Sequence, residues 1–129
     1  MDIINDIKIA EYFSLYEFDC PCCRRVMLSP DLLARVAHLR RAINRPIYIN
    51  SGYRCKKENR RVGGAPGSYH LLGMAADIHA GDFLLSELLT YAQEIEFNGI
   101  GFYEKKNFLH LDIRPGPKRF WKGKKLIGY

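Results

Sequence analysis

Two short stretches, one near residue 70 and one near residue 110, constrain the fold of this 129-residue chain more than any other feature. The first is Ser68-Tyr-His-Leu-Leu-Gly-Met-Ala-Ala-Asp77, and the second is Glu104-Lys-Lys-Asn-Phe-Leu-His-Leu-Asp112. Each contains a histidine and a carboxylate, the side chains that bind many metal ions in proteins. If these groups act together, the fold must bring two distant segments to one point.

The alternation of residue types in the second stretch predicts a strand with one polar and one apolar face. On an extended strand His110 and Asp112 share a face, while the neighbouring leucines and isoleucine share the other. The apolar face belongs to the core, so the histidine and the acid line the opposite side. The strand that begins at Ala75 can pair with this one and bring Asp77 beside His110. His70 then reaches the same point from the preceding turn.

The rest of the chain predicts an α+β fold, a small antiparallel sheet flanked by helices, in one domain covering residues 1–129. Ser29 and Pro30 begin a helix that ends before Pro46, with one apolar face made by Leu32, Val36, Leu39 and Ile43. A second helix is expected near 83–95, and strands near 47–50, 75–80, 99–103 and 108–113. The tail is expected to wrap over the sheet, anchored by Trp121. No apolar run approaches the roughly 20 residues that span a membrane.

The donor types in the two stretches favour zinc. Two imidazoles and a carboxylate, from His70, Asp77 and His110, suit a zinc ion with an open position, although cobalt and nickel accept the same donors. Zinc lowers the pKa of bound water, which favours hydrolysis. Hydrolysis also needs a proton acceptor, and Glu104 is the first candidate. Asp112 is the second, and its spacing from His110 equally fits a supporting hydrogen bond.

Positive charge is the other feature with functional meaning. The net charge is +6 and the pI about 9.2, with basic residues concentrated at 40–45, 54–61 and 118–125. Such a surface attracts polyanions, and an ordinary solvated surface explains it equally well. No nucleic-acid recognition motif accompanies the charge, so a nucleic-acid partner is not expected. The Arg54 guanidinium can hold a carboxylate or an oxyanion, or make a surface salt bridge.

The four cysteines divide into a cluster and a single residue. Cys20, Cys22 and Cys23 stand in Cys-Pro-Cys-Cys, and Cys55 follows Arg54. In a reducing compartment this pattern favours free thiols or a thiolate metal site over disulfides. The paired Cys-x-x-Cys knuckles of a structural zinc site are absent, and outside the cell Cys55 can bridge to the cluster. Free thiols, a thiolate metal site and a disulfide all stay open.

The motifs taken together resemble the LAS group of zinc peptidases, especially the D-alanyl-D-alanine carboxypeptidase family and its phage endolysin relatives. Ser68 to Asp77 matches the family pattern Ser-x-His-x-x-Gly-x-Ala-x-Asp in full. His110-Leu-Asp112 is similar to the closing motif of the short, single-domain members. Ser51-Gly-Tyr-Arg54 resembles the segment that carries the family's substrate-binding arginine. The resemblance extends from Phe13 to Trp121.

This resemblance implies a fold like the DD-peptidases and the hedgehog signalling domain, and it implies roles for six residues: zinc ligands His70, Asp77 and His110, and substrate-binding residues Tyr53, Arg54 and Ser68. Arg54 would also stabilise the transition-state oxygen. One position departs from the family pattern. Many members carry a catalytic acid where this chain has Asn107, and often a histidine where it has Phe108. Glu104 resembles the glutamate of the hedgehog domain and is expected to serve as the base.

We therefore expect a zinc metallopeptidase that hydrolyses peptidoglycan stem peptides as a D-Ala-D-Ala carboxypeptidase. An endolysin-type endopeptidase is the nearest alternative, and a zinc-containing binding module with weak or no catalysis belongs to another class. The acidic start of the chain lacks the layout of a signal peptide, which predicts synthesis in the cytoplasm. A phage or prophage product that acts on the cell wall, or a cytosolic enzyme of wall recycling, fits that expectation. The sequence indicates no oligomeric state.

Overall fold

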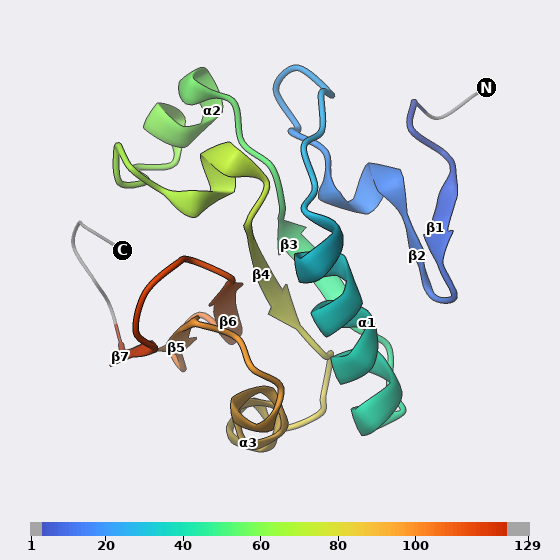
Figure 1. Cartoon of the computed structure of the whole chain (residues 1–129), viewed down its shortest axis with the longest axis vertical. Helices are drawn as coiled ribbons and strands as arrows, with labels where there is room; N and C mark the ends of the chain where they lie inside the picture. The colour runs from blue at the N-terminus through green and yellow to red at the C-terminus, as the bar shows by residue number, and fades with distance from the viewer. Residues whose placement is uncertain (1–3, 124–129) are drawn as a thin grey trace.

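A five-stranded sheet forms the centre of the molecule, as the computed structural model in Figure 1 shows. The structure describes residues 4–123. Along the sheet the strands lie in the order β3 (Tyr48–Ser51), β4 (Ala75–His79), β6 (Phe108–Asp112), β5 (Gly99–Tyr103) and β7 (Arg119–Lys122). A separate hairpin near the N-terminus pairs β1 (Lys8–Ala10) with β2 (Phe13–Ser14). The polar motifs thus lie on β4 and β6, which are neighbours.

Helices cover one face of the sheet and surround one end of it. The two long helices are α1 (Pro30–Ile43) and α3 (Leu85–Glu94). A short helix, α2 (Lys56–Arg61), and two 3₁₀ turns, Leu15–Phe18 and Tyr69–Leu72, complete the described elements. The predicted α+β class is confirmed. Within residues 4–123 no helix is long and apolar enough to cross a membrane.

Helix α1 shows how local sequence sets its ends and its buried face. The Ser29 Oγ accepts a hydrogen bond from the Asp31 N–H, and Pro30 needs no partner in the first turn. The helix ends at Asn44, which adopts the left-handed conformation with φ of 52°. The predicted apolar face is confirmed, since all four of its residues are buried: Leu32, Val36, Leu39 and Ile43. Helix α3 begins after Leu84, slightly later than predicted, and no side chain caps its first turn.

The two faces of the central strands differ in the way that alternation predicts. Leu109 and Leu111 point into the main core, together with Ala76 and Ile78 from β4. His110, Asp112 and Asp77 occupy the opposite face, and they are buried as well. Burying these ionisable groups is costly unless each has a partner. The opposite face therefore carries a polar site and not a solvated surface.

The sheet is mixed, which corrects the expectation of an antiparallel one. Strand β7 pairs parallel with β5, whereas the other pairs are antiparallel. Within the tail expected to wrap, residues 119–122 instead continue the sheet as an edge strand, while residues 124–129 of that tail lie outside the described residues. Gly101 pairs with Trp121 in this register, and the indole covers the space above that glycine. The anchoring role of Trp121 thus comes from strand pairing.

Two glycines on β5 make room for the polar face. A Cβ added at Gly99 would lie 2.3 Å from the Asp112 Oδ1, and one at Gly101 would lie 2.5 Å from the Trp121 Nε1. Real Cβ atoms do not approach so closely, so larger residues would displace the carboxylate or the indole. These positions need glycine for space, since neither has a positive φ.

We expect Gly99→Ala to lower the free energy of unfolding by about 2 kcal/mol, because the methyl group overpacks against Asp112. Urea unfolding at neutral pH measures the change. Gly67→Ala is the matched control, since nothing lies within 4 Å of a Cβ there. The control should stay within about 0.5 kcal/mol of the parent. Equal stability of the two variants would contradict the role of space at Gly99.

Candidate metal centre

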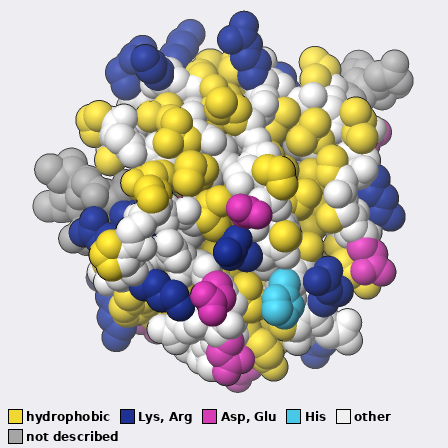
Figure 2. Space-filling model, viewed as in Figure 1, with side chains coloured by type: hydrophobic (Ala, Val, Ile, Leu, Met, Phe, Trp, Pro, Cys, Tyr) yellow, Lys and Arg dark blue, Asp and Glu magenta, His cyan; other side chains and the backbone are white. Residues whose placement is uncertain are grey.

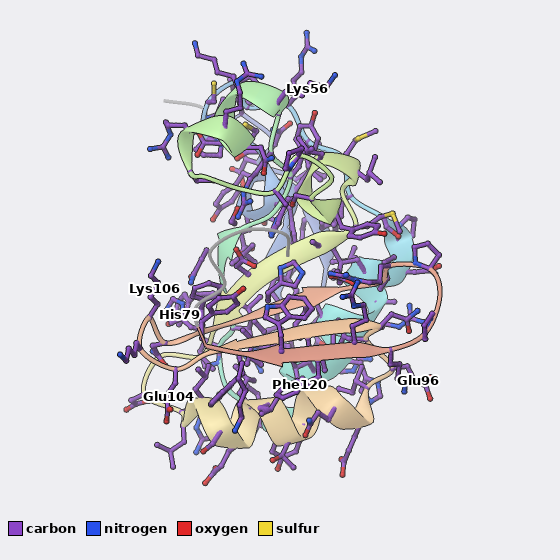
Figure 3. All side chains as sticks on the ribbon, turned by 90° about the vertical axis from the view of Figure 1, so that its left-hand side faces the viewer. Lys56, His79, Glu96, Glu104, Lys106 and Phe120 are labelled. Atoms are coloured by element: carbon purple, nitrogen blue, oxygen red, sulfur yellow. The ribbon has the colours of Figure 1, made fainter. Side chains whose placement is uncertain are left out.

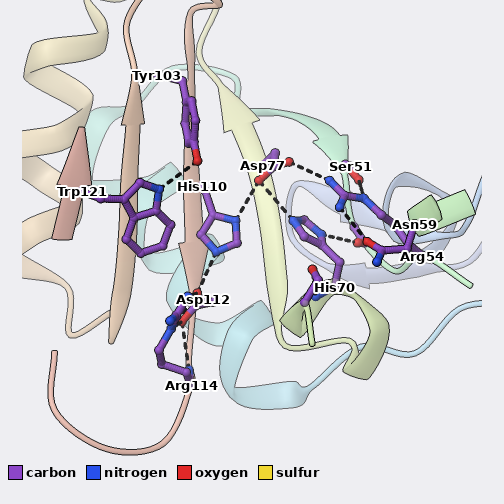
Figure 4. A network of polar contacts seen from close by, with 12 residues as sticks. Ser51, Arg54, Asn59, His70, Asp77, Tyr103, His110, Asp112, Arg114 and Trp121 are labelled. Atoms are coloured by element: carbon purple, nitrogen blue, oxygen red, sulfur yellow. Dashed lines mark hydrogen bonds and ion pairs between the residues drawn. The ribbon is translucent and has the colours of Figure 1, made fainter. Parts of the chain in front are cut away.

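Three buried side chains meet at one oxygen atom of Asp77 (Figure 4). The His70 Nε2 lies 3.2 Å from the Asp77 Oδ1, and the His110 Nδ1 lies 3.0 Å from the same atom. Asp77 and His110 are directly opposed in the pairing of β4 with β6. The three potential ligand atoms lie within 4.8 Å of one another. The structure thus brings together the three residues that the sequence singled out.

The turn before β4 aims His70 at this point. The Ser68 Oγ accepts a hydrogen bond from the His70 N–H and begins the 3₁₀ turn. Gly73 ends the turn in the left-handed conformation, with φ of 70°. A Cβ at Gly73 would also lie 2.4 Å from the Met27 carbonyl oxygen. Ser68 and Gly73 of the motif therefore shape the backbone, and Ser68 is buried in that task.

In each imidazole, the ring nitrogen that points away from Asp77 forms a hydrogen bond with an oxygen acceptor. The His70 Nδ1 lies 2.7 Å from the Gly52 carbonyl oxygen, which can only accept a hydrogen bond. The His110 Nε2 lies 2.7 Å from the Asp112 Oδ2, an ionised carboxylate. Both rings therefore carry a proton on the outward nitrogen. In the neutral rings the inward nitrogens then present lone pairs to Asp77.

Three electron-pair donors facing one point require a positive partner, either a proton or a cation. The pKa shifts correspond to the first case, in which inward ring nitrogens carry protons and donate to Asp77. Burial alone would raise the pKa of Asp77, but the His70 charge and hydrogen bonds from both imidazoles lower it well below its usual range. Burial would lower the pKa of His110, yet its bonds to Asp112 and Asp77 raise it above its ordinary value. Two imidazoles and a carboxylate also match the ligands of a zinc ion with an open position.

Asp112 is held between His110 and Arg114. The Arg114 Nη2 donates to its Oδ2 at 2.7 Å, and the Nε donates to its Oδ1 at 2.9 Å. Burial would raise the pKa of Asp112, but these bonds and the one from His110 hold it well below its usual range. Asp112 therefore fixes the orientation of His110, the supporting role considered for it from the sequence. Arg114 was not predicted, although its even spacing from Asp112 was a usable signal.

Arg54 lies on the other side of Asp77. Its Nη2 donates to the Asp77 Oδ2 at 3.2 Å, its Nε to the Ser51 Oγ at 3.0 Å and its Nη1 to the Asn59 Oδ1 at 3.2 Å. Its guanidinium thus holds one oxygen of Asp77 while the histidines share the other. Tyr53, the neighbouring predicted residue, is half-buried, and its N–H donates to the Phe18 carbonyl oxygen at 2.8 Å. Asn59 was missed by the sequence reasoning.

The structure does not bring Glu104 into this network. Glu104 is exposed in the turn between β5 and β6, and Figure 3 shows it at the tip of that hairpin, near α3. Glu104 follows Tyr103, the last residue of β5. The alternation of side chains that places His110 on the polar face of the sheet does not apply to Glu104, because Glu104 lies in a turn. Asn107 lies in the same turn with φ of 55°. The base role expected of Glu104 therefore lacks support from its position.

Aromatic residues wall the centre on the β7 side. The Trp121 ring lies 5.3 Å from the His110 ring, measured between centroids, and its Nε1 donates to the Tyr103 hydroxyl at 2.8 Å. The Arg114 guanidinium contacts the faces of the Tyr69 and Trp121 rings, 4.9 Å and 5.2 Å from their centroids. On the β3 side, Ser51 and Gly52 help to line a surface hollow of about 490 Å³.

The sequence profile of the Peptidase M15 family matches residues 11–112. This chain belongs to that family. The match spans both polar motifs and the Ser51–Arg54 segment, so the residues of the centre lie within it, except Arg114 and Trp121. The resemblance stated from the motifs is confirmed.

Individual relatives cover a shorter region. Peptidoglycan L,D-endopeptidase MepK of Escherichia coli K12 is 35% identical over 82 residues, which cover 60% of this chain and 44% of the relative. A probable L,D-endopeptidase MepK of Haemophilus influenzae is 36% identical over 85 residues, covering 62% and 45%. Zinc D-Ala-D-Ala carboxypeptidase of Streptomyces albus G is 35% identical over 81 residues, covering 60% and 31%. The matched regions span less than half of these relatives.

We expect Asp112→Asn to destabilise the chelator-treated protein by about 3 kcal/mol at pH 7, because it leaves the buried Arg114 charge unpaired. The folded pKa of Asp112 is depressed, so its contribution is complete above the ordinary value of 3.8 and is lost as the pH falls toward the folded value. The difference from the parent should therefore shrink below pH 3.8.

Urea unfolding across this pH range measures the effect. Asp82→Asn, at an exposed aspartate, is the control and should change stability by no more than about 0.5 kcal/mol. A difference between parent and Asp112→Asn that stays constant with pH would show that the ionised carboxylate is not the stabilising group.

Proposed function

We propose that this chain is a zinc-dependent peptidase that hydrolyses peptide bonds in peptidoglycan stem peptides. The observation that carries the proposal is that the outward nitrogens of His70 and His110 both donate hydrogen bonds to acceptors. Their inward nitrogens and the Asp77 Oδ1 then present three electron pairs to one point. Family membership and the names of the relatives support the same reaction class. His70 Nε2, His110 Nδ1 and Asp77 are the proposed zinc ligands.

Residues around the three proposed ligands prepare the site for hydrolysis. A bound zinc ion supplies Lewis acidity and an activated water molecule. The Gly52 carbonyl and the Asp112 carboxylate fix the outward ring protons of the two imidazoles, so the inward nitrogens are the ones that bind the metal, in place of any proton held there. Arg54 holds the second oxygen of Asp77 and leaves the first for the metal. Trp121 covers one side of His110 and limits the access of water.

The bond that is cut is the finer part of the proposal. A carboxypeptidase must hold the terminal carboxylate of its substrate, and Arg54 was the residue expected to do so. In this structure Arg54 donates to Asp77, Ser51 and Asn59, so a substrate carboxylate would have to share its guanidinium with them. This favours an internal cut of the stem peptide, as in the L,D-endopeptidase relatives. Removal of terminal D-alanine is the second candidate, supported by the Streptomyces relative.

Digestion of purified muropeptides by the zinc-loaded chain, followed by mass spectrometry, separates these candidates. An internal cut releases a longer peptide fragment or separates two cross-linked stem peptides, whereas a carboxypeptidase releases single D-alanine. His110→Ala should lose both cleavage and one zinc equivalent, while His38→Ala, at an exposed helix position, should keep both. A folded parent that holds zinc and binds muropeptides without cutting them would identify a binding module.

We expect Glu104→Gln to retain cleavage within about twofold of the parent, because its side chain lies outside the network. A positioned general base contributes about 100-fold or more, so the two roles are easily told apart by initial rates. Lys105→Gln, in the same exposed turn, controls for altered turn structure. A loss of two orders of magnitude confined to Glu104→Gln would restore Glu104 as the base.

A further inference from the structure

All four cysteines of the chain gather at the end of the molecule that carries α2. The Sγ atoms of Cys20, Cys23 and Cys55 lie within 4.8 Å of one another. The sulfurs of Cys20 and Cys55 lie 3.6 Å apart. Cys22 precedes Cys23 in the same loop, and its thiol is exposed. The candidate metal centre uses none of these side chains.

The loop from Cys20 is shaped to present more than one sulfur to the same point. The Cys20 N–H donates to the Arg25 carbonyl at 2.8 Å, and the Arg24 N–H donates to the Cys20 carbonyl at 2.7 Å. Arg24 adopts the left-handed conformation, with φ of 64°, where the chain reverses. Cys20 and Cys23 thereby form a Cys-x-x-Cys turn. The second knuckle, whose absence the sequence indicated, is replaced by Cys55 from a distant segment.

The hydrogen bond from the Glu58 N–H is the largest cause that lowers the pKa of Cys55, to about 7, and so favours its thiolate form. The Cys55 N–H donates to the Cys20 Sγ at 3.5 Å, and the Glu58 N–H donates to the Cys55 Sγ at 3.4 Å. N–H groups directed at sulfur stabilise its negative charge. Figure 2 shows Lys and Arg gathered over α2, and Figure 3 places Lys56 there. The exposed cations of the loop after Cys20 and of α2 are Arg24, Arg25, Lys56, Lys57, Arg60 and Arg61.

We propose that Cys20, Cys23 and Cys55 hold a second zinc ion, which is structural, and that the neighbouring Cys22 supplies the fourth thiolate. Four thiolates are the closed tetrahedral set of structural zinc. With Zn–S bonds of about 2.3 Å, the sulfurs of such a site lie about 3.8 Å apart, close to the observed 3.6 Å between Cys20 and Cys55. A disulfide requires about 2.05 Å. The spacing of the sulfurs therefore matches metal binding better than oxidation.

The position of this zinc site gives it a structural task. It joins the loop after the 3₁₀ turn at Leu15–Phe18 to Cys55, the residue after Arg54. The same two segments already touch where the Tyr53 N–H donates to the Phe18 carbonyl. A Cβ at Gly52 would lie 2.6 Å from the Phe18 carbonyl oxygen, so the backbones are in close contact. The zinc site fixes the position of the segment from which Gly52 and Arg54 reach the candidate metal centre.

Metal analysis of the full chain, produced with zinc and kept reduced, tests the proposal. We expect the parent to hold two zinc equivalents, and Cys23→Ser and His110→Ala to lose one each, while His38→Ala keeps both. Cobalt substitution identifies the ligands, because thiolates bound to cobalt give a charge-transfer absorption in the near ultraviolet. That absorption should appear in the parent and in His110→Ala and be missing in Cys23→Ser.

The cobalt absorption depends only on the cysteines, so it separates this proposal from the proposed peptidase activity. A parent with cobalt but no thiolate absorption would overturn the second zinc site. An intact mass showing a disulfide in the freshly prepared parent would do the same. If Cys23→Ser does not fold, a mercurial that blocks thiols should release one zinc equivalent from the parent. Release of no zinc by that reagent would also refute the site.

Discussion

The shared contact of two imidazoles with the Asp77 Oδ1 is the interaction on which the rest of the site depends. This contact holds His70 and His110 within hydrogen-bonding distance of Asp77 in a buried position. There the electron pairs of the three groups repel one another or compete for protons. Such an arrangement persists only if surrounding groups fix every other atom of the three side chains. The Gly52 carbonyl, Asp112 and Arg54 do this from three directions. The site is thus organised before any metal enters.

The fold supplies those three directions from different parts of the chain. Strand β6 carries both His110 and Asp112, whose carboxylate fits because Gly99 on the adjacent strand has no side chain. The segment after β3 carries Gly52 and Arg54, and it rests on the backbone of Phe18. The proposed zinc site at Cys55 lies directly beside it. The stability of the cysteine cluster and the positions of the side chains around Asp77 are therefore linked, because only a few backbone residues separate Cys55 from Gly52 and Arg54.

Sequence reasoning succeeded where the pattern is local and failed where it depends on remote contacts. Alternation along β6 and direct pairing with β4 sufficed to bring Asp77 beside His110. Glu104 shows the limit, because closeness in sequence to a strand says little about where a turn residue points. The contact of Cys55 with the Cys20 loop is closed only by the tertiary fold. Strand β7 was missed because Gly, Pro and Lys around it resemble a loop, and only its pairing with β5 in the folded chain makes it a strand.

The place of Trp121 gives the molecule a spectroscopic consequence. It is the single tryptophan of the chain, and its ring lies against the His110 imidazole on one side and the Arg114 guanidinium on another. Indole emission responds to charge on neighbouring groups. The intrinsic fluorescence of this protein should therefore report the state of His110, whether that imidazole is neutral, protonated or holding a metal, without any added label.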